Sequence, residues 1–300
     1  MSADKLNNSE ILFLFDGKRC NPNGDMDNEN KPRMDIDTDT NLVSDVRMKR
    51  YLRDYWKKVK DKNIFISEEA GNAEKRVQKI LDRKPSKKKP VSDEELVKIA
   101  DTCCDVKFFG AVLGTPGGNS HLTGPVQFNW GYSLNKVELQ DTKTITSSFS
   151  SGEGVGKDYR VKYSFIAFSG GISGLAAENT NLTSDDITLL DEAMIKSIPL
   201  NRTRSKIGQT PRFYLRVELQ DNQSYLNDLR EYIKLDYKDE ERDVREITQF
   251  DVDINEMVMY LNYNKDKINT VYYWKDSKLN FKDNGFDKLA DDIDKIELNY

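Results

Sequence analysis

Positively charged side chains are concentrated in two short segments of the chain. Residues 41–60 hold seven lysines and arginines against two aspartates, and residues 201–216 hold five such cations and no acid. The whole chain carries a net charge of −5, but residues 221–300 alone carry −8, so residues 1–220 carry +3. Phosphate groups are recognised by local clusters of positive charge. The acidic overall balance therefore does not exclude a nucleic acid as ligand.

The more basic segment is predicted to form an amphipathic helix over about 42–60. At 100° per residue, its apolar residues fall on one face and most of its cations on a separate stripe. The apolar face contains Met48, Leu52, Tyr55, Trp56 and Val59, and the basic stripe contains Arg47, Arg50, Arg53 and Lys57. Cations at this spacing suit successive phosphates, and arginine can bind a phosphate through two N–H groups. A basic stripe is often only the solvated face of a helix, but no glutamate lies at i±4 to neutralise this one.

A polar turn follows the first apolar run of the chain. The run Ile11–Asp16 is typical of a buried strand, and the residues after it favour a turn. That turn contains Arg19, Asn21, Asn23 and Gly24. Asparagine amides donate and accept hydrogen bonds, and glycine lets a ligand approach the backbone closely. We expect the strand to deliver this turn to the neighbourhood of the basic helix.

The order of the predicted elements indicates an α+β fold with a mostly antiparallel sheet. Strands are predicted at 11–16, 107–113, 125–130, 160–168 and 212–219, and helices at about 42–60 and 184–197. The second helix begins at a capping sequence that contains Thr183 and Asp186. Strand, helix, strands, helix, strand is the order of a ferredoxin-like or RNA-recognition-motif core.

We expect two parts of unequal size. Residues 1–220 would form the core, with large insertions at about 61–105 and 131–159; the first is predicted to be mostly helical and the second to be polar chain between strands. Residues 221–300 would form an acidic extension packed on the core, with helices at its start and end.

The sequence offers little for nucleophilic or thiol chemistry. Cys20, Cys103 and Cys104 lack both a disulfide framework and C-x-x-C spacing, so buried or idle thiols are expected. The single histidine, His121, lies in a glycine-rich stretch that predicts a surface loop. No catalytic residue and no cofactor are predicted.

The carboxylates at 25–39 are candidate ligands for a metal ion. An EF-hand beginning at Asp35 fails, because Thr40 and Val46 occupy the positions of its glycine and glutamate. No metal is predicted. No apolar stretch approaches the roughly 20 residues of a membrane span, and the first ten residues lack the pattern of a secretory signal. We expect a cytoplasmic protein without a membrane partner.

Five stretches, taken in order, resemble the backbone subunits of type I CRISPR surveillance complexes, and specifically the type I-B branch of the Cas-seven family. They are NPNGD at 21–25, RMDIDTDTNLVSDVRMKRYLRDYW at 33–56, DVKFFGAVL at 105–113, TGPVQFNWGYSLNKV at 123–137 and NRTRSKIGQTPRFYLRVEL at 201–219. Together they cover most of 10–220. Residues 222–300 show little of this resemblance, and no function is inferred for them.

The resemblance implies a prokaryotic, non-enzymatic RNA-binding protein of antiviral defence. Its fold would be an RNA-recognition-motif-like core elaborated as palm, helical fingers and a thumb-like hairpin. Several copies would polymerise head to tail along one guide crRNA as a helical filament, the backbone of a Cascade ribonucleoprotein with other subunits. The protein would grip the guide's backbone and leave its bases to pair with target DNA.

Within this frame, three groups of residues are predicted to bind RNA. The helix would supply Arg47, Lys49, Arg50 and Arg53, the first turn Arg19, Asn21, Asn23 and Gly24, and the segment before the last strand Arg204, Ser205, Lys206 and Gln209. Phe128 and Trp130 are candidates for stacking or wedging, although aromatic residues in a strand are more often core. The strand at 160–168 lacks the aromatic signature of RNA-recognition motifs, so stacking on an open sheet face is not expected.

The alternative function is a metal-dependent endoribonuclease, like the backbone subunits of the related type III complexes, which cut target RNA with a loop aspartate. Asp25 and Asp37 are the residues whose replacement would then abolish cutting. By resemblance, type I backbone subunits do not cut, and carboxylate-rich loops are usually only solvated.

Overall fold

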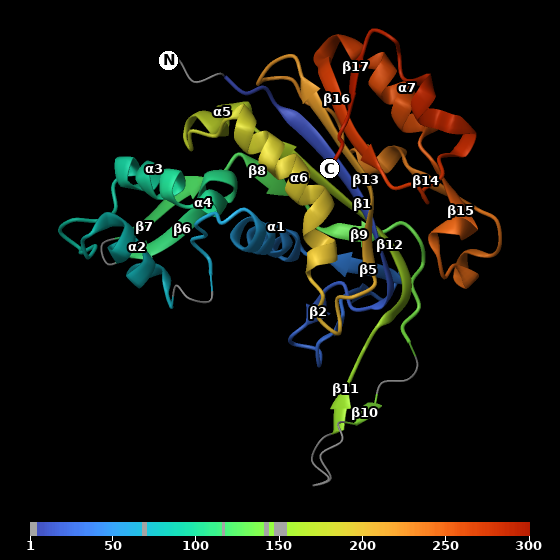
Figure 1. The fold of residues 1–300 in the computed structure, drawn as a ribbon, viewed down its shortest axis with the longest axis horizontal. Helices are drawn as coiled ribbons and strands as arrows, with labels where there is room; N and C mark the ends of the chain where they lie inside the picture. Colours follow the sequence, from blue (N-terminus) through green and yellow to red (C-terminus); the bar gives the residue numbers. More distant parts are fainter. Residues whose placement is uncertain (1–4, 68–70, 116–117, 141–143, 147–154) are drawn as a thin grey trace.

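The computed structural model describes residues 5–67, 71–115, 118–140, 144–146 and 155–300. Nine strands of this described part form one sheet with β1 in its middle (Figure 1). In spatial order they are β17 (Asp294–Glu297), β16 (Ile268–Lys275), β13 (Gln209–Leu219), β1 (Ser9–Cys20), β12 (Val161–Ile172), β9 (Gly131–Ser133), β5 (Thr40–Val43) and β4 (Met34–Asp35), while β8 (Val126–Phe128) also pairs with β12. Neighbouring strands are antiparallel except β16 and β17. The predicted α+β class with a mostly antiparallel sheet is confirmed.

Helices and short hairpins surround this sheet. The α-helices are α1 (Asp45–Val59), α2 (Ala73–Leu81), α3 (Asp93–Thr102), α4 (Cys104–Phe109), α5 (Gly174–Glu178), α6 (Ser184–Leu200) and α7 (Asn255–Tyr263). The hairpins are β2 (Gly24–Asp25) with β3 (Lys31–Pro32), β6 (Gly110–Thr115) with β7 (Gly118–Thr123), β10 (Thr144–Thr146) with β11 (Val155–Lys157), and β14 (Lys234–Tyr237) with β15 (Phe250–Asp253). The β10–β11 hairpin lies well away from the main sheet (Figure 1).

Both faces of the sheet are buried. Phe13 and Phe15 of β1 point to the face covered by α1 and α6, where they join one hydrophobic core. Leu12 and Leu14 alternate with them and point to the opposite face, which is covered by residues from 226–293. All four side chains are fully buried. The acidic C-terminal segment therefore supplies the second layer of the protein, and β16 and β17 extend the sheet itself.

The helical insertion forms a third core of its own. Val77 of α2, Ile99 of α3 and Val106 of α4 belong to it. It is joined to the main body by aromatic stacking, since the Trp56 ring of α1 lies 4.5 Å from the Phe108 ring and 5.5 Å from the Phe109 ring. The predicted helical character of this insertion is confirmed.

Local sequence signals determine where the two helices on the sheet begin. Thr183 and Asp186 form a capping box at the start of α6, as predicted. Ser44 caps α1 by accepting a hydrogen bond from the Arg47 N–H. The Ser44 N–H and hydroxyl in turn donate to Asn23 Oδ1, both at 2.9 Å. The turn after β1 is thereby attached to the first turn of α1.

Several predictions about elements are wrong. The run 107–113 is not one strand: it contains the end of α4 and the start of β6, which meet at Gly110 with φ of 73°. The C-terminal segment does not have helices at its start and end, because it begins with a 3-10 turn (Leu229–Tyr232) and ends after β17. His121 lies in β7 rather than in a loop, although it is exposed. Val59 is half exposed rather than buried.

Arg53 also does not lie on an exposed basic stripe of the helix, contrary to the prediction. Its side chain points inward and is only 9% exposed. Its Nε donates to Asp105 Oδ2 at 2.9 Å, and Asp105 also accepts from the backbone N–H groups of Phe65 and Ile66. This buried ion pair connects α1 to the insertion.

None of the helices in the described residues has the length and apolar composition that crossing a bilayer requires.

The Arg53–Asp105 pair gives a stability prediction. Replacing Arg53 by Met keeps most of the buried volume but leaves the Asp105 carboxylate buried without its cation. We expect Arg53→Met to lower the free energy of unfolding by about 3–5 kcal/mol, measured by chemical denaturation. Lys58→Gln, at an exposed position of the same helix, should change it by less than about 0.5 kcal/mol. Equal losses in the two variants would contradict the assignment.

Candidate nucleic-acid interface

Two loops that are far apart in the sequence meet beside the first half of α1. The Asn21 N–H donates to the Ser205 carbonyl at 2.8 Å, and the Lys18 N–H donates to the Gly208 carbonyl at 2.9 Å. Gly208 has φ of 105°, and a Cβ at this position would lie 2.4 Å from the Lys18 carbonyl oxygen. Only glycine permits this approach. The predicted turn after β1 and the predicted basic segment before β13 are therefore one structural unit, which we call the loop unit.

The side chain of Lys206 holds the two loops of this unit together. Its Nζ donates to the carbonyl oxygens of Asn21 at 2.6 Å and Pro22 at 3.0 Å. Burial, with a smaller effect from the nearby Arg47 guanidinium, lowers the pKa of Lys206 to about 7. The Tyr51 hydroxyl of α1 donates to Gln209 Oε1 at 3.0 Å. Lys206 and Gln209 thus shape the backbone of the loops, rather than presenting their polar groups to solvent.

The asparagines and the glycine of the first turn also fix the backbone of the loops. Asn21 and Asn23 are buried, and the Asn21 side chain donates to the Asn30 carbonyl at 2.8 Å. Gly24 packs so closely on Asn30 that a Cβ would lie 1.9 Å from its Oδ1. These residues hold the turn in one conformation.

The cations of α1 are partly neutralised by aspartates. Lys49 pairs with Asp45 at 3.2 Å, and Arg50 pairs with Asp54 at 3.0 Å. Both acids lie four residues from their partners on the helix, so the sequence contains the signal for this pairing, which a search for glutamates alone overlooks. The Arg47 guanidinium lies 4.3 Å from the centre of the Tyr51 ring, beside the loop unit. Arg47 and Arg50 remain partly exposed.

The loop unit presents two exposed arginines. The Arg204 side chain is 64% exposed, with Asp158 at 4.0 Å. Arg19 is exposed and has no ion pair among the residues that the structure describes. Arg160 Nη1 donates to the Arg19 carbonyl at 2.8 Å, and its Nη2 donates to the Arg204 carbonyl at 3.2 Å. Arg160, which sequence reasoning missed, fixes the two backbones that carry these arginines.

The two aromatic candidates differ. Phe128 is buried in the core and packs on Gly170, where a Cβ would lie 2.5 Å from its ring. Its side chain therefore supports β12 and does not face solvent. Trp130 is exposed, and the Arg33 guanidinium lies 5.8 Å from the centre of its ring.

The surroundings of the cysteines and of the carboxylates Asp25 and Asp35 indicate structural roles for these groups. Burial raises the pKa of the Cys20 thiol to about 12 and of the Cys103 thiol to about 11. Asp25 forms an ion pair with Arg33 at 3.1 Å. Asp35 accepts a hydrogen bond from the Asp37 N–H at 3.1 Å. Within the described ranges, no three of the histidines, cysteines and acids come close enough together to hold a metal ion.

The shifted pKa of Lys206 gives a pH prediction. In the unfolded chain this lysine has its ordinary pKa of 10.5, so between pH 7 and 10.5 the unfolded state binds more protons. Stability conferred through this group therefore rises with pH across that window. Cys20 and Tyr51, which face the same interior, have raised pKa values.

We expect the wild type to gain melting temperature relative to Lys206→Met when the pH is raised from 7 to 9.5, measured by calorimetry. A constant difference between the two proteins across this range would contradict the inferred burial of the ammonium group.

Comparison with known proteins places this geometry in one family. A family model described as CRISPR-associated protein Cas7 matches residues 7–255. The chain is 33% identical over 304 aligned residues to the CRISPR-associated protein Cas7 of Haloferax volcanii, covering 91% of this chain and 88% of that protein.

Two solved structures are similar in fold. One is a chain of a "CRISPR RNA-guided surveillance complex, pre-nicking", with a TM-score of 0.59 at 15% identity over 97% of this chain and 96% of that chain. The other belongs to a "CRISPR RNA-guided surveillance complex", with a TM-score of 0.55 at 14% identity over 98% of this chain and 95% of that chain. The match to the family model and the identity to the Haloferax protein confirm the resemblance at the level of the family, and the chain belongs to the CRISPR-associated Cas7 family.

Proposed function

We propose that this chain is a non-catalytic, guide-RNA-binding backbone subunit of a type I-B Cascade complex in the prokaryotic cytoplasm. Copies assemble head to tail along one crRNA, together with other Cascade subunits. They hold the guide by its sugar–phosphate backbone and leave its bases to pair with target DNA. The observation that carries this proposal is the pair of exposed arginines, Arg19 and Arg204, on a loop unit locked by Lys206, Gln209 and Arg160.

The strand order supports an RNA-recognition-motif-like core. In chain order, β1, α1, β9, β12, α6 and β13 give strand–helix–strand–strand–helix–strand, and the four strands lie side by side as β13, β1, β12 and β9. This order matches that of a ferredoxin-like fold, in which both helices pack on one face of the sheet. We propose that residues 1–220 contain this palm, that α2–α4 with β6 and β7 are the fingers, and that β10 and β11 belong to the thumb. Residues 221–300 are then the extension packed on the core.

The covered sheet supports contact with the RNA backbone through loops. An ordinary RNA-recognition motif stacks bases on its open sheet face, but here residues from 226–293 occupy that face. A nucleic-acid strand must then contact the loops and helix ends at the rim. Such contacts, made by cations on a rigid surface, bind the strand with little dependence on base sequence.

The predicted RNA-binding residues fall into contacting and supporting roles. Arg19, Arg204, Arg47 and Arg50 are proposed to contact phosphates, and Lys49 to contribute from the neighbouring position of α1. Asn21, Asn23, Gly24, Ser205, Lys206 and Gln209 are proposed to fix the backbone that the guide touches. Arg53 and Phe128 would act only through the packing of α1 and β12, because both side chains are buried.

The resemblance to solved surveillance complexes supports the proposed partners. Two chains of complexes named as CRISPR RNA-guided share this fold over nearly their whole length. In a head-to-tail assembly, one surface of each copy meets a different surface of the next, which produces an open helix whose length the guide sets. The acidic residues 221–300 and the basic residues 41–60 offer surfaces of opposite sign.

Removing the two exposed arginines tests the proposal. We expect Arg19→Gln with Arg204→Gln to weaken binding of single-stranded RNA of any sequence. The slope of log K against log salt should fall by about 0.7 for each phosphate that the variant no longer neutralises. Fluorescence anisotropy at several salt concentrations measures both quantities. Lys58→Gln, which removes an exposed cation elsewhere on α1, is the matched control.

The same samples separate binding from cleavage. After incubation with Mg²⁺, we expect RNA bound by the wild type to remain intact on a denaturing gel. Cuts at a regular spacing, abolished by Asp25→Asn or Asp37→Asn, would instead establish the endoribonuclease. An unchanged affinity and salt slope in the double arginine variant would refute the proposed role of these arginines.

A further inference from the structure

A series of three neighbouring cavities lies where β1 and β12 meet the C-terminal segment. Its middle is a cavity of about 390 Å³ lined by Lys18, Arg19, Gln140, Lys162 and Arg245. A second cavity of about 310 Å³ shares Lys18 with it, and a third of about 530 Å³ shares Lys162. We call these three neighbouring cavities, which share lining residues, the lateral groove.

Cations outnumber acids along the lateral groove. Its lining cations are Lys18, Arg19, Lys136, Lys162, Arg212, Arg242, Arg245 and Lys278, and its lining acids are Asp16, Asp39, Glu138 and Glu246. Arg212 forms a buried pair with Asp16 at 2.8 Å and also pairs with Asp276 at 2.6 Å, and Lys18 pairs with Glu246 at 3.0 Å. The rest give the groove a surplus of positive charge, although the C-terminal segment that forms one wall is acidic overall.

One carboxylate occupies the place where an anion would bind. Glu138 Oε2 accepts hydrogen bonds from Lys162 Nζ at 2.7 Å and from Arg245 Nη2 at 3.0 Å. The hydrogen bond from Lys162 is the main reason that the pKa of Glu138 is lowered. All three side chains are about a third or more exposed. Exposed pairs of this kind contribute little to stability, so a phosphate can replace the carboxylate at small cost.

The backbone around Arg245 is fixed before any ligand arrives. The Arg245 N–H donates to Gln249 Oε1 at 2.7 Å, and its Nη1 donates to the carbonyls of Arg242 at 2.6 Å and Val244 at 2.8 Å. Val244 and Ile247 on either side are buried in the second core. The connection between β14 and β15 therefore presents Arg245 from a rigid position.

We propose that the lateral groove is a second subsite for the phosphodiester backbone of a nucleic-acid strand, in which Lys162 and Arg245 exchange Glu138 for a phosphate. The inference rests on the proposed function, since Arg19 belongs to both surfaces and Arg160 connects it to Arg204. A strand gripped at the loop unit continues past Arg19 into the groove. The C-terminal segment thereby contributes directly to nucleic-acid binding.

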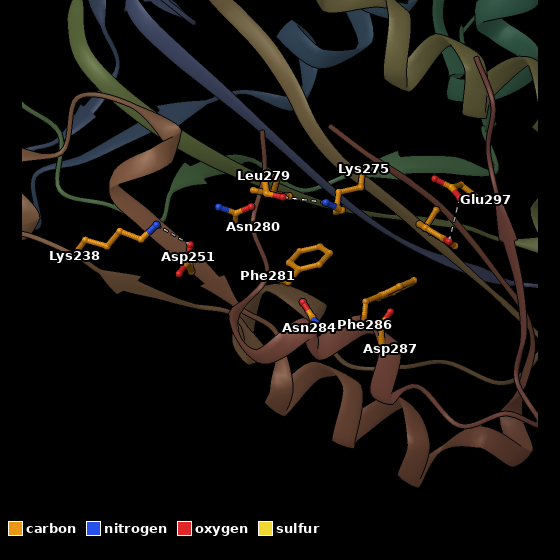
Figure 2. Close-up of a pocket in the computed structure, with 11 residues that line it drawn as sticks. Lys238, Asp251, Lys275, Leu279, Asn280, Phe281, Asn284, Phe286, Asp287 and Glu297 are labelled. Carbon is orange, nitrogen blue, oxygen red and sulfur yellow. Dashed lines mark hydrogen bonds and ion pairs between the residues drawn. The ribbon is translucent and has the colours of Figure 1, made fainter. Parts of the chain in front are cut away.

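Another large cavity in the C-terminal segment does not have this chemistry. Figure 2 shows this cavity of about 480 Å³, with the Phe281 and Phe286 rings among its lining side chains. Three carboxylates line it against two lysines. Lys238 pairs with Asp251 at 3.0 Å, as the dashed line in Figure 2 marks. Lys238 thus offers a matched control: a cation in an exposed ion pair of the same segment, outside the lateral groove.

Glu138→Gln and Arg245→Gln test the exchange in opposite directions. We expect Glu138→Gln to tighten binding of a single-stranded RNA by about two- to fivefold, because it releases both cations from their carboxylate partner. Arg245→Gln should weaken binding and lower the salt slope by about 0.7. Lys238→Gln should leave both unchanged. Anisotropy titrations of the full chain at several salt concentrations measure these effects, with melting temperatures to verify folding.

The outcomes distinguish this inference from the proposed function. If Glu138→Gln leaves the affinity for both single-stranded RNA and single-stranded DNA unchanged, while the Arg19 and Arg204 variant binds more weakly, the subsite alone is overturned. A wild type that binds no strand overturns both. Parallel titrations with single-stranded DNA of the same sequence identify the strand: effects on RNA alone assign the groove to the guide, and effects on DNA alone assign it to the DNA strand of the surveillance complex.

Discussion

The burial of both sheet faces is the constraint on which the proposed function of this protein depends. β1 places Phe13 and Phe15 under α1 and α6 and places Leu12 and Leu14 under the C-terminal segment. Neither face can then receive a base without losing a hydrophobic core. The proposed binding surface is therefore the rim, where the ends of β1, β12 and β13 deliver loops and cations. This arrangement favours recognition of a strand by charge and shape, which suits a subunit that must accept any guide sequence.

The charges at this rim are organised by partners within the protein. Lys206 holds two carbonyls, Arg160 holds two more, and Glu138 joins Lys162 to Arg245. These interactions fix the positions of the loops before a ligand is bound, so binding costs less conformational entropy. They also divide the cations into those that support the loops and those that remain exposed, with Lys206 in the first group and Arg19 in the second.

Sequence patterns correctly predict structural features that depend on residues close together in the sequence. The strand at 212–219 and the capping box of α6 are predicted correctly, because strand patterns and caps are local signals. The run 107–113 is predicted wrongly, since a short apolar stretch fits a helix end or a strand equally well. The strand β16 is not predicted, although its residues INTVYYWK include β-branched and aromatic types that favour strands. The residues around it are rich in asparagine and aspartate, which are typical of turns and obscure a single strand.

The candidate site is predictable as segments but not as individual roles. The turn after β1 lies at the start of α1, as expected. That the segment before β13 joins this turn is not predicted, because the contact is between residues far apart in the sequence. The inward turn of Arg53 does not follow from the pattern of α1, because its partner Asp105 lies 52 residues away. The hydrogen bond of Lys206 with Asn21 spans 185 residues. Long-range pairing of this kind decides which cations of a basic segment support the fold.

Chemical probing of an assembled complex tests the central claim most directly. Hydroxyl radicals report the exposure of each ribose, and dimethyl sulfate reports the exposure of the pairing edges of adenine and cytosine. With several copies of the wild type on one guide-length RNA, the account predicts protected riboses and bases that mostly remain reactive. Protected bases with riboses still open to cleavage would show that this protein reads or buries the bases, and would contradict binding by the backbone.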